Sequence, residues 1–340
     1  MILIDDIKTG KKGSSFNAGS KARSDIDVIL KNETLIFMDN ANNQNLIRRS
    51  LDFFQAYSQV KSAPEDSVFL VQYPLYMINR YNDVLFDYLA DKKSIALIHD
   101  INSLRAYPNQ KEMHINEVKV LNRFHAIISH NKKMSAWLKE NGLTRPIVEL
   151  ECFDYLYEGN VETKEKQYDI SFAGNLSYEK SQFLYEAINQ NQDVSFELFG
   201  VGFDEAKAHS NAFHYKGSKH PDELIHCFES GFGLIWDGDS ITTCTGNFGN
   251  YERYNNPHKL SMSIAAQLPV IVWEEAAIAD FVKNNHIGIP VRSLTNLRKT
   301  LDSVSPQEYA TMKSNLRELS KKVQSGQFTK KAIEMAVHQL

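Results

Sequence analysis

Several features typical of common protein classes are scarce or missing from these 340 residues. Only three cysteines occur, at distant positions and with no CxxC pair, so the sequence encodes neither a disulfide framework nor a thiolate zinc site. Lys and Arg total 38 against 42 for Asp and Glu, a formal net charge of −4. This balance excludes a general basic field for binding nucleic acid, and no nucleic-acid partner is expected.

Long hydrophobic runs are also missing. The opening residues, Met-Ile-Leu-Ile-Asp-Asp, turn acidic too soon for a signal peptide, and no run of about 18 apolar residues follows. Together with the few cysteines, this pattern is typical of a protein of the reducing cytoplasm. We therefore predict a cytoplasmic protein that does not span a membrane, and leave open a peripheral contact at the inner face of the membrane.

What the chain does contain is an alternation of short β-branched apolar runs with amphipathic stretches, the pattern of parallel sheets with crossover helices. In the first half, strands are expected at residues 35–38, 68–72, 95–99, 126–129 and 147–149. After a polar stretch at 157–167, further strands are expected at 169–172, 195–199, 213–215, 233–236, 270–273 and 287–291. The sequence therefore predicts an α/β protein with two doubly wound, Rossmann-like domains.

The strongest functional candidate is the polar, Gly-rich and aromatic stretch at residues 236–259, which follows an apolar strand and precedes an apolar helix pattern. A loop of this length in a compact domain is usually functional. Pro257 suits the start of the following helix, and Lys259 lies where free backbone N–H groups and the helix dipole favour an anion. This arrangement indicates a diphosphate site; the alternative is that Lys259 is an ordinary solvated lysine.

A second candidate is the strand-to-helix turn at residues 172–180. Gly174 permits the close approach of a phosphate, Asn175 offers an amide, and Lys180 adds positive charge at the start of the next helix. The alternative is an ordinary strand-to-helix connection with no ligand.

In the first half, a fully apolar strand ends in His99 and Asp100. At the carboxyl end of a strand, a carboxylate can deprotonate an acceptor hydroxyl and a histidine can donate a hydrogen bond to substrate. The alternative is that Asp100 caps the next helix and His99 packs at the strand end. A basic loop that includes Asn17, Gly19 and Lys21 could close over an anionic donor, or could be a solvated loop.

Metal sites are not expected. The eleven histidines include no HExxH pattern, and Asp237-Gly238-Asp239 is an isolated DxD-like match. Since the nearby Lys259 could neutralise a leaving diphosphate, we predict metal-independent chemistry with no cofactor.

Several blocks of the sequence resemble bacterial β-1,6-galactofuranosyltransferases of surface-polysaccharide synthesis, and they extend over nearly the whole chain. The chain is more distantly similar to the glucosyltransferases that extend O-linked glycans on serine-rich adhesins. The blocks are residues 18–23, 98–100, 128–131, 173–177, 231–240, 255–259 and 268–273.

The resemblance implies a GT-B fold, in which two Rossmann-like domains face a central cleft. Residues 1–156 would form the N-terminal acceptor domain and residues 168–320 the UDP-sugar domain, while residues 321–340 would form a helix that crosses back to the first domain. The adhesin-type relatives suggest a homo-oligomer.

The resemblance also implies roles for individual residues. Asn175, Lys180 and Lys259 would contact the nucleotide diphosphate, and Gly174 lies in the same block. Glu274 or Glu275 would bind the ribose hydroxyls, and Asp237 would lie near the donor sugar. A β-product from an α-linked donor requires inversion and a general base, for which Asp100 is the candidate and Asp239 or His99 the alternatives.

The predicted function is transfer of a hexosyl group, best matched by galactofuranose in β-1,6 linkage, from a UDP-sugar to a lipid-linked or protein-linked glycan acceptor. One alternative is a glucosyl- or galactopyranosyltransferase that uses UDP-glucose or UDP-galactose. Another is a non-catalytic sugar-nucleotide-binding subunit of a partner transferase.

Overall fold

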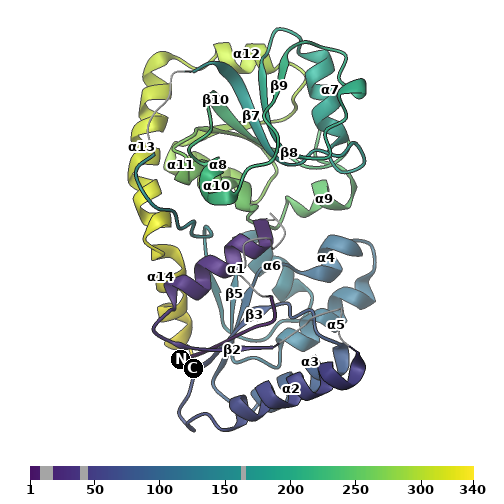
Figure 1. Cartoon of the computed structure of the whole chain (residues 1–340), viewed down its shortest axis with the longest axis vertical. Helices are drawn as coiled ribbons and strands as arrows, with labels where there is room; N and C mark the ends of the chain where they lie inside the picture. The colour runs from purple at the N-terminus through teal and green to yellow at the C-terminus, as the bar shows by residue number, and fades with distance from the viewer. Residues whose placement is uncertain (8–17, 39–44, 162–165) are drawn as a thin grey trace. The chain divides into compact units, whose positions relative to one another are not determined.

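The computed structural model describes all residues except 8–17, 39–44 and 162–165, and the chain divides into two compact units (Figure 1). The first unit comprises residues 1–151 and 326–340, and the second comprises 152–325. The boundaries expected from the sequence, at residues 156 and 320, differ from these by five residues each. Backbone hydrogen bonds account for the difference, because Glu151 N still donates to His130 O at 3.0 Å, whereas Tyr155 N donates to Val323 O at 3.1 Å.

The first unit is built on a six-stranded parallel sheet with the strand order β2-β1-β3-β4-β5-β6. The strands are β1 (Ile2–Asp5), β2 (Thr34–Phe37), β3 (Phe69–Tyr73), β4 (Ser94–Ile98), β5 (Ala126–Ser129) and β6 (Ile147–Glu149). The helices are α1 (Ala18–Ile29), α2 (Leu46–Lys61), α3 (Asn79–Leu89), α4 (Asn102–Ala106), α5 (Lys111–Leu121), α6 (Lys132–Glu140) and α14 (Gln327–Val337). The expected strands are confirmed within a few residues.

The sequence prediction omitted β1, which is an interior strand of the first sheet. Its four residues are all buried, and it pairs in parallel with both β2 and β3. The run is too short to show periodicity, and the acidic residues at its end are unusual for a buried strand. The buried Asp5 at that end is instead ion-paired, as described below, and the strand order reverses beside β1.

The second unit is built on a parallel sheet with the order β12-β11-β10-β7-β8-β9. The strands are β7 (Tyr168–Asn175), β8 (Phe196–Val201), β9 (Phe213–Tyr215), β10 (Ser230–Ile235), β11 (Val270–Trp273) and β12 (Gly288–Val291). The helices are α7 (Gln182–Gln190), α8 (Pro221–Leu224), α9 (Gly246–Tyr251), α10 (His258–Ala265), α11 (Ala279–Asn285), α12 (Leu297–Asp302) and α13 (Pro306–Gln324), with a 3-10 turn at Glu205–Lys207. This is the strand order of a doubly wound dinucleotide-binding domain.

Ser325 and Gly326 separate α13 from α14, so residues 321–340 comprise the end of α13 and the whole of α14 rather than the one helix expected. Gly326 adopts φ +73°, and a Cβ at this position would lie 2.7 Å from Ile29 Cγ1. Both the left-handed backbone and the close approach therefore require glycine. After this turn, α14 packs against β5 and β6 and belongs to the first unit.

Within the described ranges, none of the helices is both long enough and apolar enough to cross a membrane.

Candidate functional site

The site lies where the strand order of the second sheet reverses, between β7 and β10. From this point the chain connections run to opposite sides, so the carboxyl ends of the two strands border a crevice in which open α/β sheets bind ligands. Lys180 follows β7, Asp237 follows β10, and Lys259 is the second residue of α10. The reversal of strand order thus explains why residues far apart in the sequence meet here.

Two lysines converge on one carboxylate at this crevice. Lys180 Nζ donates to Asp237 Oδ1 at 2.8 Å, and Lys259 Nζ lies 3.5 Å from Asp237 Oδ2. Lys259 Nζ also donates to the backbone oxygen of Trp236 at 3.3 Å. The structure therefore brings together three of the predicted donor-site residues.

Both ammonium groups also stand over aromatic rings. Lys180 Nζ lies 3.2 Å from the centre of the Phe248 ring, and Lys259 Nζ lies 4.8 Å from the centre of the Phe172 ring. The electrostatic attraction of a cation to a ring face helps to hold each ammonium group in place. The side chains of Lys180 and Lys259 are only 26% and 19% exposed, so neither is a fully solvated lysine.

Gly174 contributes by its small size. A Cβ at this position would lie 3.5 Å from Lys259 Cε, in ordinary van der Waals contact, so any larger side chain would compete with the lysine for space. Asn175, the last residue of β7, uses its Oδ1 atom to accept a hydrogen bond from Ser177 N at 2.9 Å. This interaction shapes the turn and leaves the amide NH₂ of Asn175 as the group with which it could reach a ligand.

The two lysines control the ionisation of Asp237. Burial acts to raise the pKa of this carboxyl, but the charges of Lys259 and Lys180 outweigh burial and hold the pKa below its usual value. Asp237 is therefore a carboxylate at neutral pH and neutralises part of the lysine charge.

Glu252, a residue that the sequence reasoning missed, is a second carboxyl group of the site. Its side chain is buried, and burial is the main reason that its pKa is raised to about 7. Lys259 and Lys180 act to lower this pKa, whereas Asp237 acts to raise it. The charge of the site consequently changes near neutral pH, which no sequence pattern could have indicated because it depends on burial.

One glycine and several hydrogen bonds within the stretch hold the conformation of the long polar segment after β10. Gly238 adopts φ +107°, and a Cβ there would lie 2.2 Å from Thr245 O, so only glycine fits. Thr245 Oγ1 donates to Asp239, and Trp236 Nε1 donates to Ser240 O at 2.9 Å. The stretch also contains α9, which carries Phe248 and which the sequence did not predict.

The two glutamates expected at the ribose follow β11. Glu274 is exposed, and its backbone N donates to Val291 O at 2.8 Å. Glu275 is ion-paired with Arg253, whose guanidinium lies 4.3 Å from the centre of the Trp273 ring. The assignment of these two glutamates to the ribose stays a prediction.

The first unit has a buried polar network at its own reversal point, between β1 and β3. Arg23 pairs with Asp5, and both side chains are at most 2% exposed. Gln72 Nε2 donates to Asp5 Oδ2 at 3.3 Å, and its Oε1 lies 2.8 Å from His99 Nε2. His99 is therefore part of this network. From the sequence it could be either a catalytic residue or a histidine packed at the strand end.

Asp6 adds a second buried carboxyl group to this network. It accepts a hydrogen bond from Tyr76 N, and its Oδ1 atom lies 3.9 Å from Arg23 Nη1. Burial raises the pKa of Asp6 to about 7, against the charge of Arg23. The sequence reasoning noticed Asp6 only as an acidic residue near the N-terminus.

Asp100, the candidate general base, follows β4 and is 24% exposed. Its Oδ2 atom accepts a hydrogen bond from Arg105 Nη1 at 2.8 Å, so a cation orients the carboxylate. Of the predicted basic loop, Asn17 lies outside the described residues. Gly19 and Lys21 belong to α1, which begins at Ala18, within the predicted loop. Lys21 Nζ is ion-paired with Asp25 at 2.7 Å.

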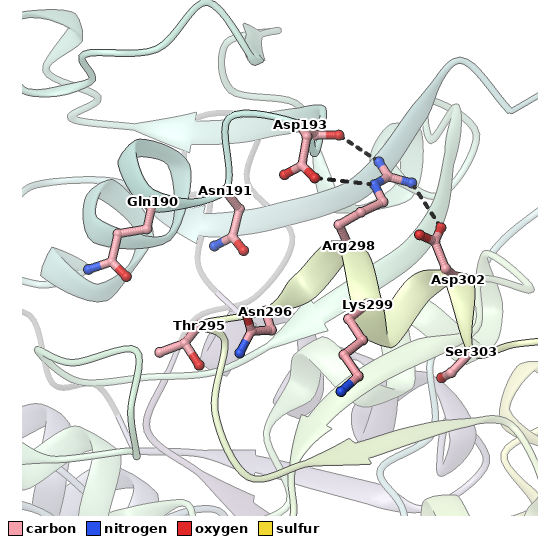
Figure 2. Close-up of a pocket in the computed structure, with 9 residues that line it drawn as sticks. All are labelled: Gln190, Asn191, Asp193, Thr295, Asn296, Arg298, Lys299, Asp302 and Ser303. Atoms are coloured by element: carbon pink, nitrogen blue, oxygen red, sulfur yellow. Dashed lines mark hydrogen bonds and ion pairs between the residues drawn. The ribbon is translucent and has the colours of Figure 1, made fainter.

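A cavity of about 630 Å³ lies elsewhere in the second unit, and Figure 2 shows the residues that line it. It adjoins α12, at the opposite end of the sheet from α9 (Figure 1). Arg298 in this cavity is paired with Asp169 at 2.7 Å and with Asp302 at 3.5 Å, so its charge is already neutralised. None of the predicted site residues lines this cavity, and we assign it no role.

Across the part of the chain that the structure describes, no group of three or more His, Cys, Asp and Glu side chains is placed to hold a metal ion.

Comparison with known proteins gives consistent matches along the chain. The model of the "Glucosyltransferase 3-like, N-terminal domain" matches residues 4–152, and that of the "Glucosyltransferase 3-like, C-terminal domain" matches residues 170–336. The chain is also 29% identical over 346 residues to the β-1,6-galactofuranosyltransferase WbbI of Escherichia coli K12, covering 100% of this chain and 99% of that protein. Both resemblances proposed from the sequence are thereby confirmed.

Two solved structures share the fold. Sucrose-phosphate synthase from Thermosynechococcus elongatus has a TM-score of 0.63 at 12% identity, covering 98% of this chain and 96% of that chain. HepE of Anabaena, solved in complex with UDP and glucose, has a TM-score of 0.60 at 14% identity, covering 99% and 98%. The predicted fold class, two Rossmann-like domains of the GT-B type, is confirmed.

Proposed function

Because the chain belongs to the glucosyltransferase 3-like family and is a glycosyltransferase, we propose that its second unit binds a UDP-sugar through the diphosphate. The observation that carries this proposal is the convergence of Lys180 and Lys259 on Asp237 at the reversal point of the second sheet. A diphosphate entering the crevice meets two cations that are already oriented. HepE, a structural neighbour solved with UDP, supports the choice of nucleotide.

The two lysines stabilise the negative charge that develops on the leaving group, UDP. As the bond between the sugar and UDP breaks, negative charge builds on the diphosphate while the sugar becomes oxocarbenium-like. Lys180 and Lys259 therefore stabilise the transition state more than the ground state, which is the condition for raising kcat. Because the cations are held by Asp237 and by the two aromatic rings beforehand, little reorganisation is required during the reaction.

We propose Asp100 as the general base that removes the proton from the acceptor hydroxyl. Its carboxylate is partly exposed and is oriented by Arg105, which supports a role at an accessible surface of the first unit. In an inverting reaction this base acts once, in a single in-line displacement at the anomeric carbon. His99 belongs to the buried network around Gln72, which favours a positioning role for this residue.

For the donor sugar we propose galactofuranose, transferred in β-1,6 linkage to a lipid-linked or protein-linked glycan. The similarity to WbbI over the full length of both chains supports this choice. Transfer of glucose or galactopyranose is the second candidate, because the matching family models are those of glucosyltransferases. We propose that the reaction needs neither a metal ion nor a cofactor, since the two lysines can neutralise the leaving diphosphate.

The direct test is UDP release in the presence of EDTA from UDP-galactofuranose, UDP-galactose, UDP-glucose and UDP-GlcNAc, each with a panel of glycan acceptors. The proposal predicts acceptor-dependent UDP release from UDP-galactofuranose above the other donors. Release from UDP-glucose instead would keep the mechanism and change the sugar. Binding of UDP without release from any donor would favour the alternative of a non-catalytic partner subunit.

A further inference from the structure

Helix α2 of the first unit is apolar on two faces. One face packs into the core through Phe53, Ala56 and Val60. On the other side, Ile47, Leu51 and Phe54 are 74%, 61% and 57% exposed. The i, i+4, i+7 spacing of these three residues places them in one stripe along the helix. Single exposed apolar residues are normal on a protein surface, but a stripe of three large ones marks an interaction surface.

The stripe is a ridge on a firm base. Phe54 lies edge-on to Tyr81 of α3 with ring centres 6.5 Å apart, and the neighbouring Phe53 stacks on the same ring at 4.5 Å. Helices α2 and α3 lie side by side in the first unit (Figure 1). A protein partner would need a groove matched to this ridge, whereas a fluid lipid surface accepts a protruding apolar ridge without one.

The charges around the stripe fit an anionic surface. Helix α2 carries Arg48, Arg49 and Lys61 against the single acid Asp52, although the whole chain has a net charge of −4. Arg48, at one end of the stripe, is 67% exposed and is ion-paired with Asp52 at 3.2 Å, and Lys61 is exposed at the other end. Of the nearby acids of α3, Asp83 and Asp87 share one cation, because Arg123 Nη1 lies 3.0 Å from Asp83 and 3.3 Å from Asp87, which offsets half of their charge.

We propose that the outer face of α2 docks the protein on an anionic phospholipid surface. Ile47, Leu51 and Phe54 enter the headgroup region, while Arg48 and Lys61 lie against the headgroup phosphates. The docking surface is separate from the donor site and does not depend on which sugar is transferred. It supplies the basic amphipathic element that the sequence pattern alone did not show, because the burial of one face and the exposure of the other appear only in the fold.

Sedimentation with vesicles tests this proposal. One set of vesicles contains equal parts of phosphatidylglycerol and phosphatidylcholine, and the other contains phosphatidylcholine alone. The test variant is Ile47→Ser/Phe54→Ser, and the matched control is Met113→Ser/Met335→Ser, which changes two exposed apolar residues elsewhere in the first unit. Far-UV circular dichroism and UDP binding on all proteins check that the fold and the donor site are intact.

We expect the wild type and the control to bind the anionic vesicles, and the test variant to need at least about tenfold more lipid. Arg48→Gln/Lys61→Gln should weaken binding to anionic vesicles and reduce its salt dependence, with Arg49 remaining on the helix. Equal binding by the test variant and the wild type would overturn the proposal, and so would a wild type that binds no vesicles. If light scattering then showed a wild-type dimer and a monomeric test variant, a second copy of the chain would be the occupant.

Discussion

Lys180 donates a 2.8 Å hydrogen bond to Asp237 although the two residues lie 57 positions apart in the sequence. The same carboxylate faces Lys259, so Asp237 keeps two like charges close together that would otherwise repel. Asp237 therefore holds the two lysine side chains close together at the crevice in the absence of ligand.

Replacing the carboxylate distinguishes two roles for Asp237. Asp237→Asn keeps the shape and removes one negative charge beside the diphosphate, so UDP should bind about five- to tenfold more tightly, a gain of about 1 kcal/mol. Isothermal titration with UDP and with the UDP-sugar measures both affinities. If Asp237 instead contacts the donor sugar, as the family resemblance implies, UDP affinity should stay unchanged and affinity for the UDP-sugar should fall.

Glu252 predicts that UDP affinity depends on pH. Its pKa is raised to about 7, so the folded protein holds this proton up to near neutrality, and the site gains a negative charge as the pH rises further. UDP should therefore bind more weakly at pH 8.5 than at pH 6. In Glu252→Gln the part of this dependence that comes from the protein should disappear, leaving only the titration of UDP itself. The same slope in both proteins would contradict the prediction.

The same group links pH to stability. The pKa of Glu252 is higher in the folded state than its ordinary value of 4.5, so deprotonation destabilises the fold. The free energy of unfolding should fall as the pH rises from about 4.5 to about 7, by roughly 1–3 kcal/mol relative to Glu252→Gln. Urea unfolding at several pH values measures this difference.

For the proposed base, Asp100→Asn should lower kcat by about 100-fold or more while leaving the affinity for UDP unchanged. Arg105→Gln removes only the partner that orients the carboxylate, so its effect on kcat should be smaller. Steady-state kinetics with the identified donor and acceptor provide the readout. Undiminished turnover in Asp100→Asn would transfer the role to Asp239 or His99.

The buried network of the first unit should be critical for stability. Arg23→Met leaves the carboxyl groups of Asp5 and Asp6 buried without their cation and should cost about 3–5 kcal/mol in the free energy of unfolding. Arg48→Met, which breaks an exposed ion pair with Asp52, should cost less than about 1 kcal/mol. Similar losses in the two variants would show that the network is not the source of stability.

The sequence predicted most of the strands because buried parallel strands are continuous apolar runs, which composition alone reveals. It missed β1, whose four residues are too few to show a pattern, and α9, which is hidden in a Gly- and Asn-rich stretch. Lys259 and Lys180 could be chosen because each lies at a recognisable strand-to-helix connection. Glu252 and the Arg23 network could not, because their properties arise from burial and from neighbours distant in sequence.

The lysine pair is proposed to bind the diphosphate of the donor, and UDP titration of Lys259→Ala in the presence of EDTA measures this role. The control is Lys299→Ala, which removes a lysine at the opposite end of the same sheet. We predict wild-type affinity in the control, at least about tenfold weaker UDP binding in Lys259→Ala, and a kcat lower by roughly 100-fold or more, for a variant that unfolds at a similar temperature. Equal UDP affinity in Lys259→Ala and the wild type would contradict the claim.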